Sequence, residues 1–448
     1  MMKVYDPITA RQTLLKRMPL DEQPVPPSLL SRLEATFGEP VSPSEAVRRI
    51  LQDIRSGGDA ALRNWTLKLD GVDLPSARVP TEKLTAALNA LDPELRSALE
   101  EAAGRIEAFY RKQPLISWMD QDLGGTLGQL LRPIERVGFY VPGGTAALPS
   151  TVLMSVIPAK VAGVKECVIV TPPTRGSGEV NPVILAAAAL VGVEEVYAAG
   201  GAQAIGLLAY GSESVRRVDK IVGPGNLFVT LAKQQVFGSV GIDGLAGPTE
   251  TVVIADESAN PAWVAADLLA QAEHDVLAAA ILLTPSRSLI KKVEKEIEAF
   301  LAESSPASLT RREIIQQSLQ GRSGVVLTRD IAEAIELANF YAPEHLNLAV
   351  RDAWEWLPKV QNSGGVFLGE TSCEVMGDYV AGPSHVMPTG GSARFASPLN
   401  VWDFVKIISV VGLDKPNAAR LGAVAEKIAL SEQLTAHALA ARLRASNQ

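Results

Sequence analysis

The feature that most constrains the fold is a long alternation of short apolar runs with helical segments, which begins near Arg136 and ends near Leu368. In its first part, strands are expected at 137–141, 166–171, 194–199 and 219–222, with helices starting near Pro149, Asn181, Ala202 and Leu227. A second series begins at Thr249, with strands expected at 251–255, 279–284, 324–328, 345–350 and 364–368 and helices at 288–301 and 331–340. Such alternation is typical of βαβ units. The sequence therefore predicts an α/β fold with two similar parallel-sheet domains.

Glycine-rich turns follow several of the expected strands, as in Gly143-Gly144, Gly200-Gly201 and Gly223-Pro224-Gly225-Asn226. Open α/β sheets bind their ligands at the ends of the strands where such turns lie. However, the chain has no Gly-x-Gly-x-x-Gly followed by an acidic residue, and no phosphate-binding loop that ends in Gly-Lys-Ser or Gly-Lys-Thr. We therefore expect Rossmann-like domains without the standard dinucleotide fingerprint.

Segments of different character flank the alternation. Residues 1–35 are charged and proline-punctuated, which indicates a short N-terminal arm. Helices are expected from Ser42 to the stop at Gly57-Gly58, at about 59–69, and at 81–112 with a break near Asp92-Pro93. We expect this helical block to pack with the second sheet. From Pro398 onward a helical tail is expected, which must pack on the body or on another subunit because it cannot form a core alone. The resulting domain prediction is an arm at 1–35, one α/β domain at 36–137 with 250–395, another at 138–249, and a tail at 396–448.

Composition excludes several classes of protein. The 448 residues carry a mild net charge of −8, which argues against a nucleic acid or an anionic membrane as the partner. With only Cys167 and Cys373, the chain has neither a disulfide framework nor a cysteine-based zinc motif. The N-terminus lacks the apolar core of a signal peptide, and the longest apolar run, 183–193, is too short to span a bilayer. We expect a cytoplasmic protein.

The first candidate for chemistry is the end of an apolar helical run that begins at Asn260-Pro261. Gln271 and His274 are three residues apart and project from one helix face, and an amide oxygen with an imidazole suits a divalent cation such as zinc. The alternative is a helix end with an exposed amide and a capping histidine. Two ligands do not complete a site, so others must come from elsewhere in the chain.

The other histidines also have candidate neighbours. His345 follows Glu344 after Pro343, just before an expected strand, where a carboxylate and an imidazole could serve as two distinct bases. The alternative is a helix-terminating turn with a surface histidine.

Two more histidines lie nearer the C-terminus. His385 and Asp378 belong to the loop 377–391, which is too rich in glycine and proline for regular structure; Asp378 offers a hard oxygen ligand, and His385 a polar contact. His437 follows Glu432 on the tail helix, where the alternative is a solvated helix face. The residues alone therefore predict a metal-dependent α/β enzyme of unspecified reaction.

These segments closely resemble the histidinol dehydrogenase family, over nearly the whole chain from about Ser42. The resemblance rests on GFYVPGG at 138–144, GGAQAI at 200–205, GPGN at 223–226, AGPTE at 246–250, QAEH at 271–274, YAPEH at 341–345 and the loop 377–391. So many long motifs in one order are very specific.

The resemblance implies a zinc enzyme that oxidises L-histidinol to L-histidine, the last step of histidine biosynthesis, in two NAD-linked steps through bound L-histidinaldehyde. It implies a homodimer with one zinc ion per subunit and shared active sites, with the tail at the interface. The implied zinc ligands are Gln271, His274 and Asp378 together with His437 from the other subunit, and Glu344 and His345 are the implied bases. The implied substrate contacts are Thr249, Gln271, His274, His345, Asp378, His385, Glu432 and His437, and the implied NAD contacts are Tyr140, Gln203 and Asn226 in the domain at 138–249.

Two positions depart from the family pattern. Thr249 stands where many members have serine, and Gln433 replaces a common glycine, but neither change removes an implied ligand or base. Three alternative functions stay open: a dehydrogenase of another polyol or amino alcohol on the same scaffold, a zinc hydrolase without a redox cofactor, and a non-catalytic binding protein. Glu432 and His385 favour histidinol chemistry among these.

Overall fold

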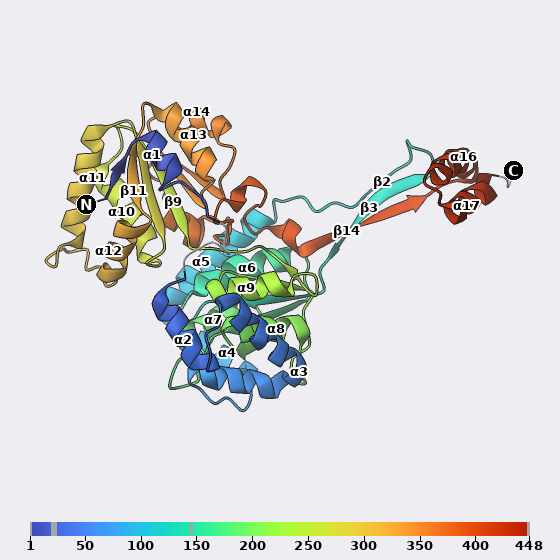
Figure 1. Ribbon diagram of the computed structural model, residues 1–448, viewed down its shortest axis with the longest axis horizontal. Helices are drawn as coiled ribbons and strands as arrows, with labels where there is room; N and C mark the ends of the chain where they lie inside the picture. Colours follow the sequence, from blue (N-terminus) through green and yellow to red (C-terminus); the bar gives the residue numbers. More distant parts are fainter. Residues whose placement is uncertain (1, 19–24, 144–146, 446–448) are drawn as a thin grey trace. The chain divides into compact units, whose positions relative to one another are not determined.

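The computed structural model describes residues 2–18, 25–143 and 147–445, so Pro24 in the arm and Gly144 in the first glycine-rich turn lie outside the described residues (Figure 1). Contacts divide the chain into a large unit, residues 1–112 and 135–403, and a small unit, residues 113–134 and 404–448. In the part of the chain that is described, no helix combines the length and the apolar character that crossing a membrane requires.

The first sheet of the large unit has the order β6-β5-β4-β7-β8, with every neighbouring pair parallel. Its strands are β4 (Arg136–Tyr140), β5 (Glu166–Thr171), β6 (Glu195–Ala198), β7 (Lys220–Val222) and β8 (Gly241–Ile242). The connecting helices are α6 (Pro149–Val161), α7 (Pro182–Leu190), α8 (Gly201–Tyr210) and α9 (Leu227–Val236). The predicted strands and helix starts of this part are confirmed to within one or two residues. The chain reverses its direction across the sheet between β4 and β7, the position at which such sheets bind ligands.

The helical block packs on the helices that flank the first sheet. It comprises α2 (Pro27–Phe37), α3 (Pro43–Asp70), α4 (Thr81–Ala90) and α5 (Pro93–Tyr110). Ser42 caps α3 by accepting a hydrogen bond from the amide of Glu45, and Gly58, at φ +49°, introduces the predicted break. The apolar face of α3 joins the core of β4, β5, α8 and α9. The expectation that the helical block packs with the second sheet is therefore wrong for α3, because helical periodicity identifies an apolar face but not the sheet that it covers.

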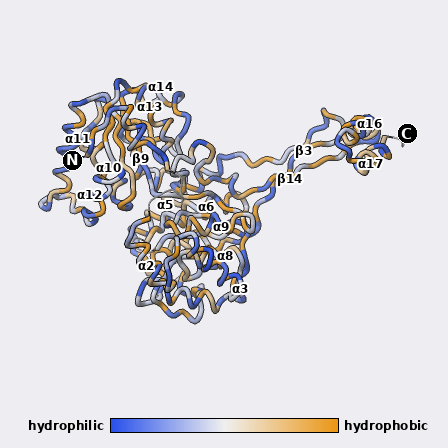
Figure 2. Tube along the Cα trace, viewed as in Figure 1, coloured by the Kyte–Doolittle hydropathy of each residue, from blue (hydrophilic) through white to orange (hydrophobic). Residues whose placement is uncertain are grey.

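The second sheet has the order β1-β11-β10-β9-β12-β13 and is also parallel throughout. Its strands are β1 (Val4–Tyr5), β9 (Glu250–Ala255), β10 (Ala279–Thr284), β11 (Gly324–Leu327), β12 (His345–Ala349) and β13 (Gly365–Leu368). Its helices are α1 (Pro7–Gln12), α10 (Pro261–Glu273), α11 (Arg287–Leu301), α12 (Arg312–Gly321), α13 (Ile331–Tyr341) and α14 (Ala353–Trp356), and short 3₁₀ turns lie at Leu357–Lys359, Ser392–Arg394 and Val401–Phe404. Hydrophobic residues run along the central strands, which are buried on both faces (Figure 2). The prediction of two parallel-sheet α/β domains is confirmed, and the N-terminal arm adds the edge strand β1.

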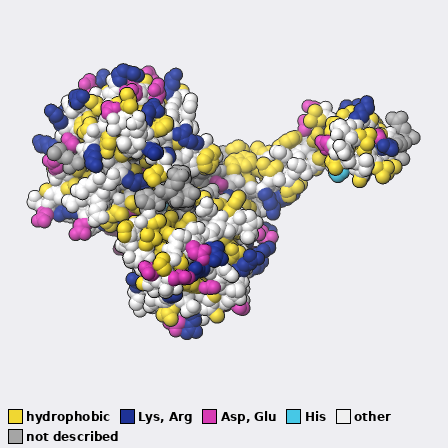
Figure 3. Space-filling view, viewed as in Figure 1, with side chains coloured by type: hydrophobic (Ala, Val, Ile, Leu, Met, Phe, Trp, Pro, Cys, Tyr) yellow, Lys and Arg dark blue, Asp and Glu magenta, His cyan; other side chains and the backbone are white. Residues whose placement is uncertain are grey.

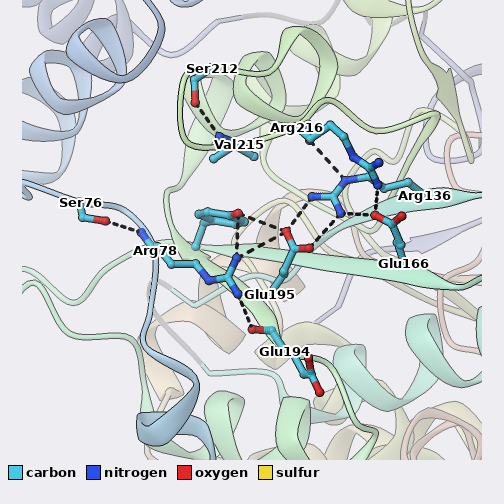
Figure 4. Close-up of polar contacts among 10 residues, drawn as sticks. Ser76, Arg78, Arg136, Glu166, Glu194, Glu195, Ser212, Val215 and Arg216 are labelled. Atoms are coloured by element: carbon cyan, nitrogen blue, oxygen red, sulfur yellow. Dashed lines mark hydrogen bonds and ion pairs between the residues drawn. The ribbon is translucent and has the colours of Figure 1, made fainter.

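A buried arginine links the amino ends of three strands in the first sheet through two ion pairs (Figure 4). Arg136, the first residue of β4, donates to Glu166 on β5 at 2.6 Å and to Glu195 on β6 at 2.7 Å. The pKa of Glu195 is lowered, chiefly by its hydrogen bond with Arg136. A charged pair that is removed from water contributes only when its geometry is good, and here each carboxylate meets the guanidinium directly. These polar residues therefore stabilise the sheet. They lie at the amino ends of its strands, whereas the glycine-rich turns follow the carboxyl ends.

The small unit contains an antiparallel sheet of order β14-β3-β2 and two helices. Its elements are β2 (Trp118–Asp120), β3 (Thr126–Pro133), β14 (Val405–Gly412), α16 (Lys415–Ser431) and α17 (Thr435–Ala445). The predicted helical tail is confirmed in α16 and α17, but it is preceded by the strand β14, where a run rich in β-branched residues favours a strand. Hydrophobic side chains gather over the strands of this unit (Figure 3), and Ile407, Ile408 and Val411 are among those exposed.

Candidate active site

The two candidate bases lie where β12 begins. Helix α13 ends at Tyr341, Ala342 adopts a left-handed conformation with φ +52°, and the chain then enters β12 at His345 directly after Glu344. β12 pairs with β9, and His345 is opposite Thr251 in the register. Both Glu344 and His345 are buried, so the alternative of a surface histidine in a simple turn is wrong.

Glu344 is held by two donors on one oxygen. The Thr249 hydroxyl donates to Oε2 at 2.5 Å, and the backbone amide of Glu250 donates to the same atom at 3.0 Å. Burial raises the pKa of Glu344 to about 7, although these hydrogen bonds and the neighbouring His345 oppose the shift. A carboxyl group with a pKa near neutrality is suited to exchange protons at physiological pH.

His345 lies between carboxylates. Its Nδ1 is 3.7 Å from Oε2 of Glu344, and its Nε2 is 3.4 Å from Oδ1 of Asp378. Burial by itself would lower the pKa of His345, but the negative charges of Glu374, Glu344 and Asp378 outweigh burial and raise it to about 10. A divalent cation bound beside Asp378 would offset these charges and return the pKa toward the range in which an imidazole accepts a proton.

The predicted pair Gln271 and His274 lies at the end of α10. Asn260 caps the start of this helix, Pro261 follows at its first position, and His274 is its last, capping residue. His274 is exposed whereas Gln271 is completely buried, so the alternative of an exposed amide is wrong. The Gln271 Oε1 lies 3.0 Å from the Thr251 hydroxyl, and Nε2 has no hydrogen-bond partner. Because buried polar groups in proteins are nearly always paired, an unpaired atom here indicates a place for a ligand.

Asp378 joins His274 in a potential metal site. Ligand atoms of His274, Glu374 and Asp378 all lie within 4.8 Å of one another. Nε2 of Gln271 is buried without a hydrogen-bond partner, and Oδ1 of Asp378 and Nε2 of His345 are buried with only their mutual contact of 3.4 Å. Imidazole and carboxylate donors in one cluster match the ligand chemistry of zinc, so these residues fit a divalent cation.

Glu374 is a residue that the sequence analysis missed. It lies on α15 (Glu374–Met376), which continues into a π-helical turn, η3 (Gly377–Ala381), that carries Asp378. The expectation of an irregular loop is therefore wrong for residues 377–381, and π-helical turns are common at functional sites. The spacing of four residues between Glu374 and Asp378 could have revealed that they share one side, had a helix been expected there.

His385 is held within the protein on both sides of its ring. Its Nδ1 donates to the backbone carbonyl of Asp378 at 2.8 Å, and Nε2 lies 3.3 Å from the hydroxyl of Thr151 on α6. Burial lowers the pKa of His385, which favours the neutral ring that these contacts require. His385 therefore holds the backbone of Asp378 in position through this hydrogen bond. Its predicted contact with the substrate stays a prediction.

Glu432 and His437 belong to the small unit. Glu432 caps the end of α16, His437 lies near the start of α17, and both side chains are exposed. Between them Gln433 has φ +61°, a left-handed conformation that favours glycine. Their roles at the metal and the substrate stay predictions.

The implied NAD contacts lie where strands of the first sheet end. Tyr140 ends β4, and its hydroxyl accepts a hydrogen bond from the Gly201 amide at 3.2 Å. Gln203 donates from Nε2 to Asp70 at 3.1 Å, while its buried Oε1 has no partner. Asn226 caps α9 by accepting from two backbone amides. The turn after β7 needs glycine, because Gly223 has φ +119° and a Cβ there would lie 2.2 Å from the carbonyl oxygen of Tyr140.

Comparison with known proteins decides the family. The model of the histidinol dehydrogenase family matches residues 38–445. The chain is 51% identical to a histidinol dehydrogenase of Deinococcus radiodurans over 99% of this chain and all of that one, and 52% identical to one of Thermus thermophilus over 89% and 94% of the two chains. The chain belongs to the histidinol dehydrogenase family. The crystal structure of histidinol dehydrogenase from Elizabethkingia anophelis, 38% identical, covers 99% of this chain and 98% of its own with a TM-score of 0.88.

Membership of the histidinol dehydrogenase family confirms the resemblance inferred from the motifs. It also makes this chain an enzyme, an oxidoreductase. The family match includes every candidate site residue, from Tyr140 to His437. The arm before residue 38 lies outside the family model, yet Arg17 in that arm forms an ion pair with Glu250, next to Thr249.

Proposed function

We propose that this chain oxidises L-histidinol to L-histidine in two NAD-linked steps through L-histidinaldehyde, with one zinc ion per subunit. The observation that carries the proposal is the pair of buried bases, Glu344 and His345, beside a cluster of possible metal ligands that includes His274 and Asp378. The names of the curated relatives, all histidinol dehydrogenases, supply the substrate.

Zinc would be held by Gln271, His274 and Asp378, and by His437 of a second copy of the chain. In support, Gln271 carries a buried amide nitrogen without a partner, and Oδ1 of the buried Asp378 has only a long contact with His345, at 3.4 Å. Ligand atoms of His274 and Asp378 lie within 4.8 Å of each other. When bound, the ion would anchor the nitrogen atoms of the substrate and so fix the reacting carbon.

The two bases would act on different oxygens. His345 removes the proton from the alcohol oxygen while the carbon that bears this oxygen gives up a hydride, so that each oxidation releases one hydride and one proton. NAD, when bound, would supply the hydride acceptor. Glu344 takes a proton from water as the water adds to the aldehyde carbon, and His345 removes a proton again in the second oxidation. The buried position of Glu344 and its pKa near 7 support this role. Retention of the aldehyde prevents loss of a reactive intermediate.

NAD would bind at the ends of the first-sheet strands, against Tyr140, Gln203 and Asn226. The unpaired Oε1 of Gln203 could accept a hydrogen bond from the cofactor, since Nε2 is already committed to Asp70. Burial raises the pKa of Asp70 to about 6, so this carboxyl remains mostly ionised at neutral pH and continues to accept that bond.

The chain would work as a homodimer in the cytoplasm. The small unit exposes apolar side chains on its strands and helices, including Ile408, Val411 and Ile428. An exposed apolar surface of this kind is typical of a protein interface. A second copy covering it could carry Glu432 and His437 to the active site.

The yield of NADH per molecule of L-histidinol tests the proposal. Purified protein with measured zinc content should form two NADH for each histidinol consumed, with L-histidine as the product. Oxidation of another polyol or amino alcohol, but not of histidinol, would mean a different substrate. Turnover that proceeds equally without NAD would indicate a zinc hydrolase, and both outcomes would refute the proposed reaction.

A further inference from the structure

The hydroxyl group of Thr251 lies between two oxygen atoms at the edge of the candidate zinc site. Its Oγ1 is 3.0 Å from Oε1 of Gln271 and also within hydrogen-bond distance of Oε2 of Glu374. All three side chains are at least 98% buried, so no solvent competes for these contacts. The positions of the hydrogen atoms on these three side chains are therefore set by their contacts with one another.

One hydroxyl has one hydrogen and cannot donate to both oxygens at the same time. Beside a bound divalent cation Glu374 is a carboxylate and can only accept, and a hydrogen bond to an ionised acceptor is the stronger of the two, so the Thr251 hydrogen then belongs to Glu374. The Gln271 Oε1 would then face a second acceptor, while Nε2 of the same amide has no partner. The two facing acceptors and the unpaired Nε2 have one cause, the orientation of the Gln271 amide.

If the amide is rotated so that its oxygen and nitrogen exchange places, Nε2 gains a partner and the two acceptors no longer face each other. Nε2 then donates to Oγ1 of Thr251, which donates in turn to Glu374, and the Gln271 oxygen occupies the place of the unpaired nitrogen. We propose that Thr251 and Glu374 act as positioning residues, whose chain of hydrogen bonds directs the carbonyl oxygen of Gln271, rather than its NH₂ group, toward the metal. This inference rests on the proposed zinc site, because an amide oxygen binds a cation and an amide nitrogen does not.

A direct role for Glu374 in binding the cation is the competing explanation, since its carboxylate lies within 4.8 Å of ligand atoms of His274 and Asp378. The two explanations differ in their dependence on residue 271. A glutamate there presents an oxygen in either orientation and needs no positioning. A positioning role for Thr251 and Glu374 must therefore disappear in Gln271→Glu, whereas a ligand role for Glu374 must persist.

The experiment measures zinc affinity by competition with a chromogenic chelator, in the native chain and in Gln271→Glu. In the native background, Thr251→Val, which keeps the side-chain shape but lacks the hydroxyl, should weaken zinc binding about 10- to 100-fold, the usual effect of losing a partner of a ligand. Thr251→Ser, the matched control, retains the hydroxyl and should bind zinc within about threefold of the native chain. In Gln271→Glu, the loss caused by Thr251→Val should fall below about threefold. The visible absorption of the cobalt-substituted protein should change with Thr251→Val only in the native background.

The proposal is overturned if Thr251→Val weakens zinc binding equally in both backgrounds, or in neither. Glu374→Leu, which removes the acceptor of the Thr251 hydrogen altogether, provides a second test should Thr251→Val fail to fold. It should weaken zinc binding in the native background alone, and an equal loss in Gln271→Glu would make Glu374 a ligand instead. Failure of the proposed function is a different result, because then the native chain itself would bind no zinc.

Discussion

Replacement of Glu344 by glutamine separates the two oxidation steps. Both hydrogen bonds to this side chain, from Thr249 and from the Glu250 amide, end on one oxygen, so the carbonyl oxygen of a glutamine can accept both. Only the ability to take a proton from water is lost. The first oxidation should proceed, whereas the second should slow by about 10²- to 10⁴-fold, the usual contribution of a general base. In a single turnover the yield should therefore fall from two NADH per histidinol toward one.

The same variant should be more stable than the native chain at alkaline pH. Burial raises the pKa of Glu344 from its ordinary 4.5 to about 7, which corresponds to about 3 kcal/mol against the ionised form in the folded state. The native chain keeps its full free energy of unfolding below about pH 4.5, the ordinary pKa of this carboxyl, and loses this amount as the pH rises through its folded pKa of about 7. Glutamine stays neutral, so Glu344→Gln should gain about 3 kcal/mol in free energy of unfolding at pH 8 but only about 1 kcal/mol at pH 5.

Two measurements check this prediction. Rapid-quench analysis of NADH and aldehyde follows the two steps, and urea unfolding of the metal-free protein at pH 5 and pH 8 follows stability. The matched control is Glu257→Gln, which makes the same chemical change at an exposed carboxyl group and should alter neither result. Equal slowing of both oxidation steps, or lower stability of Glu344→Gln at pH 8, would refute the assigned role and environment of Glu344.

Three further predictions concern other parts of the chain. His437→Ala and His345→Ala chains should each be nearly inactive, but random mixing should restore about a quarter of native activity, since each mixed dimer keeps one complete shared site; mixtures without activity would contradict sharing. Arg17→Met should lower the free energy of unfolding by about 3 kcal/mol in a urea titration, because it leaves the buried Glu250 carboxylate unpaired, and an unchanged midpoint would show that this pair contributes nothing. Gln433→Gly should stabilise the chain by about 0.5 kcal/mol, because it removes the strain of φ +61°; a lower melting temperature would contradict that reading.

The parallel-sheet architecture could be predicted from the sequence because fully buried strands appear as continuous apolar runs. The runs at 166–171 and 279–284 coincide with β5 and β10 from end to end. The small unit escaped prediction because β14 pairs with β3, almost 300 residues earlier in the chain, and is largely exposed in the single chain. Neither local periodicity nor propensity identifies such a partner.

The candidate site could be predicted in part because its residues stand in short local groups. Gln271 with His274 and Glu344 with His345 follow from spacing alone, whereas their relation to Asp378 came from the family resemblance. Thr251 was missed because it matters only through contacts between β9, α10 and α15, and Glu374 because no helix was expected at 374–378. Sequence spacing carries no signal for a hydrogen bond between residues more than 100 positions apart.

Anomalous X-ray diffraction at the zinc edge, from crystals of the zinc-loaded protein, would locate the metal itself. We expect one zinc peak per chain, about 2.0–2.2 Å from a nitrogen of His274 and an oxygen of Asp378, with the Gln271 oxygen and a histidine from a second copy, His437, completing its ligands. A zinc ion bound elsewhere, or one that no second copy of the chain approaches, would refute the shared zinc site.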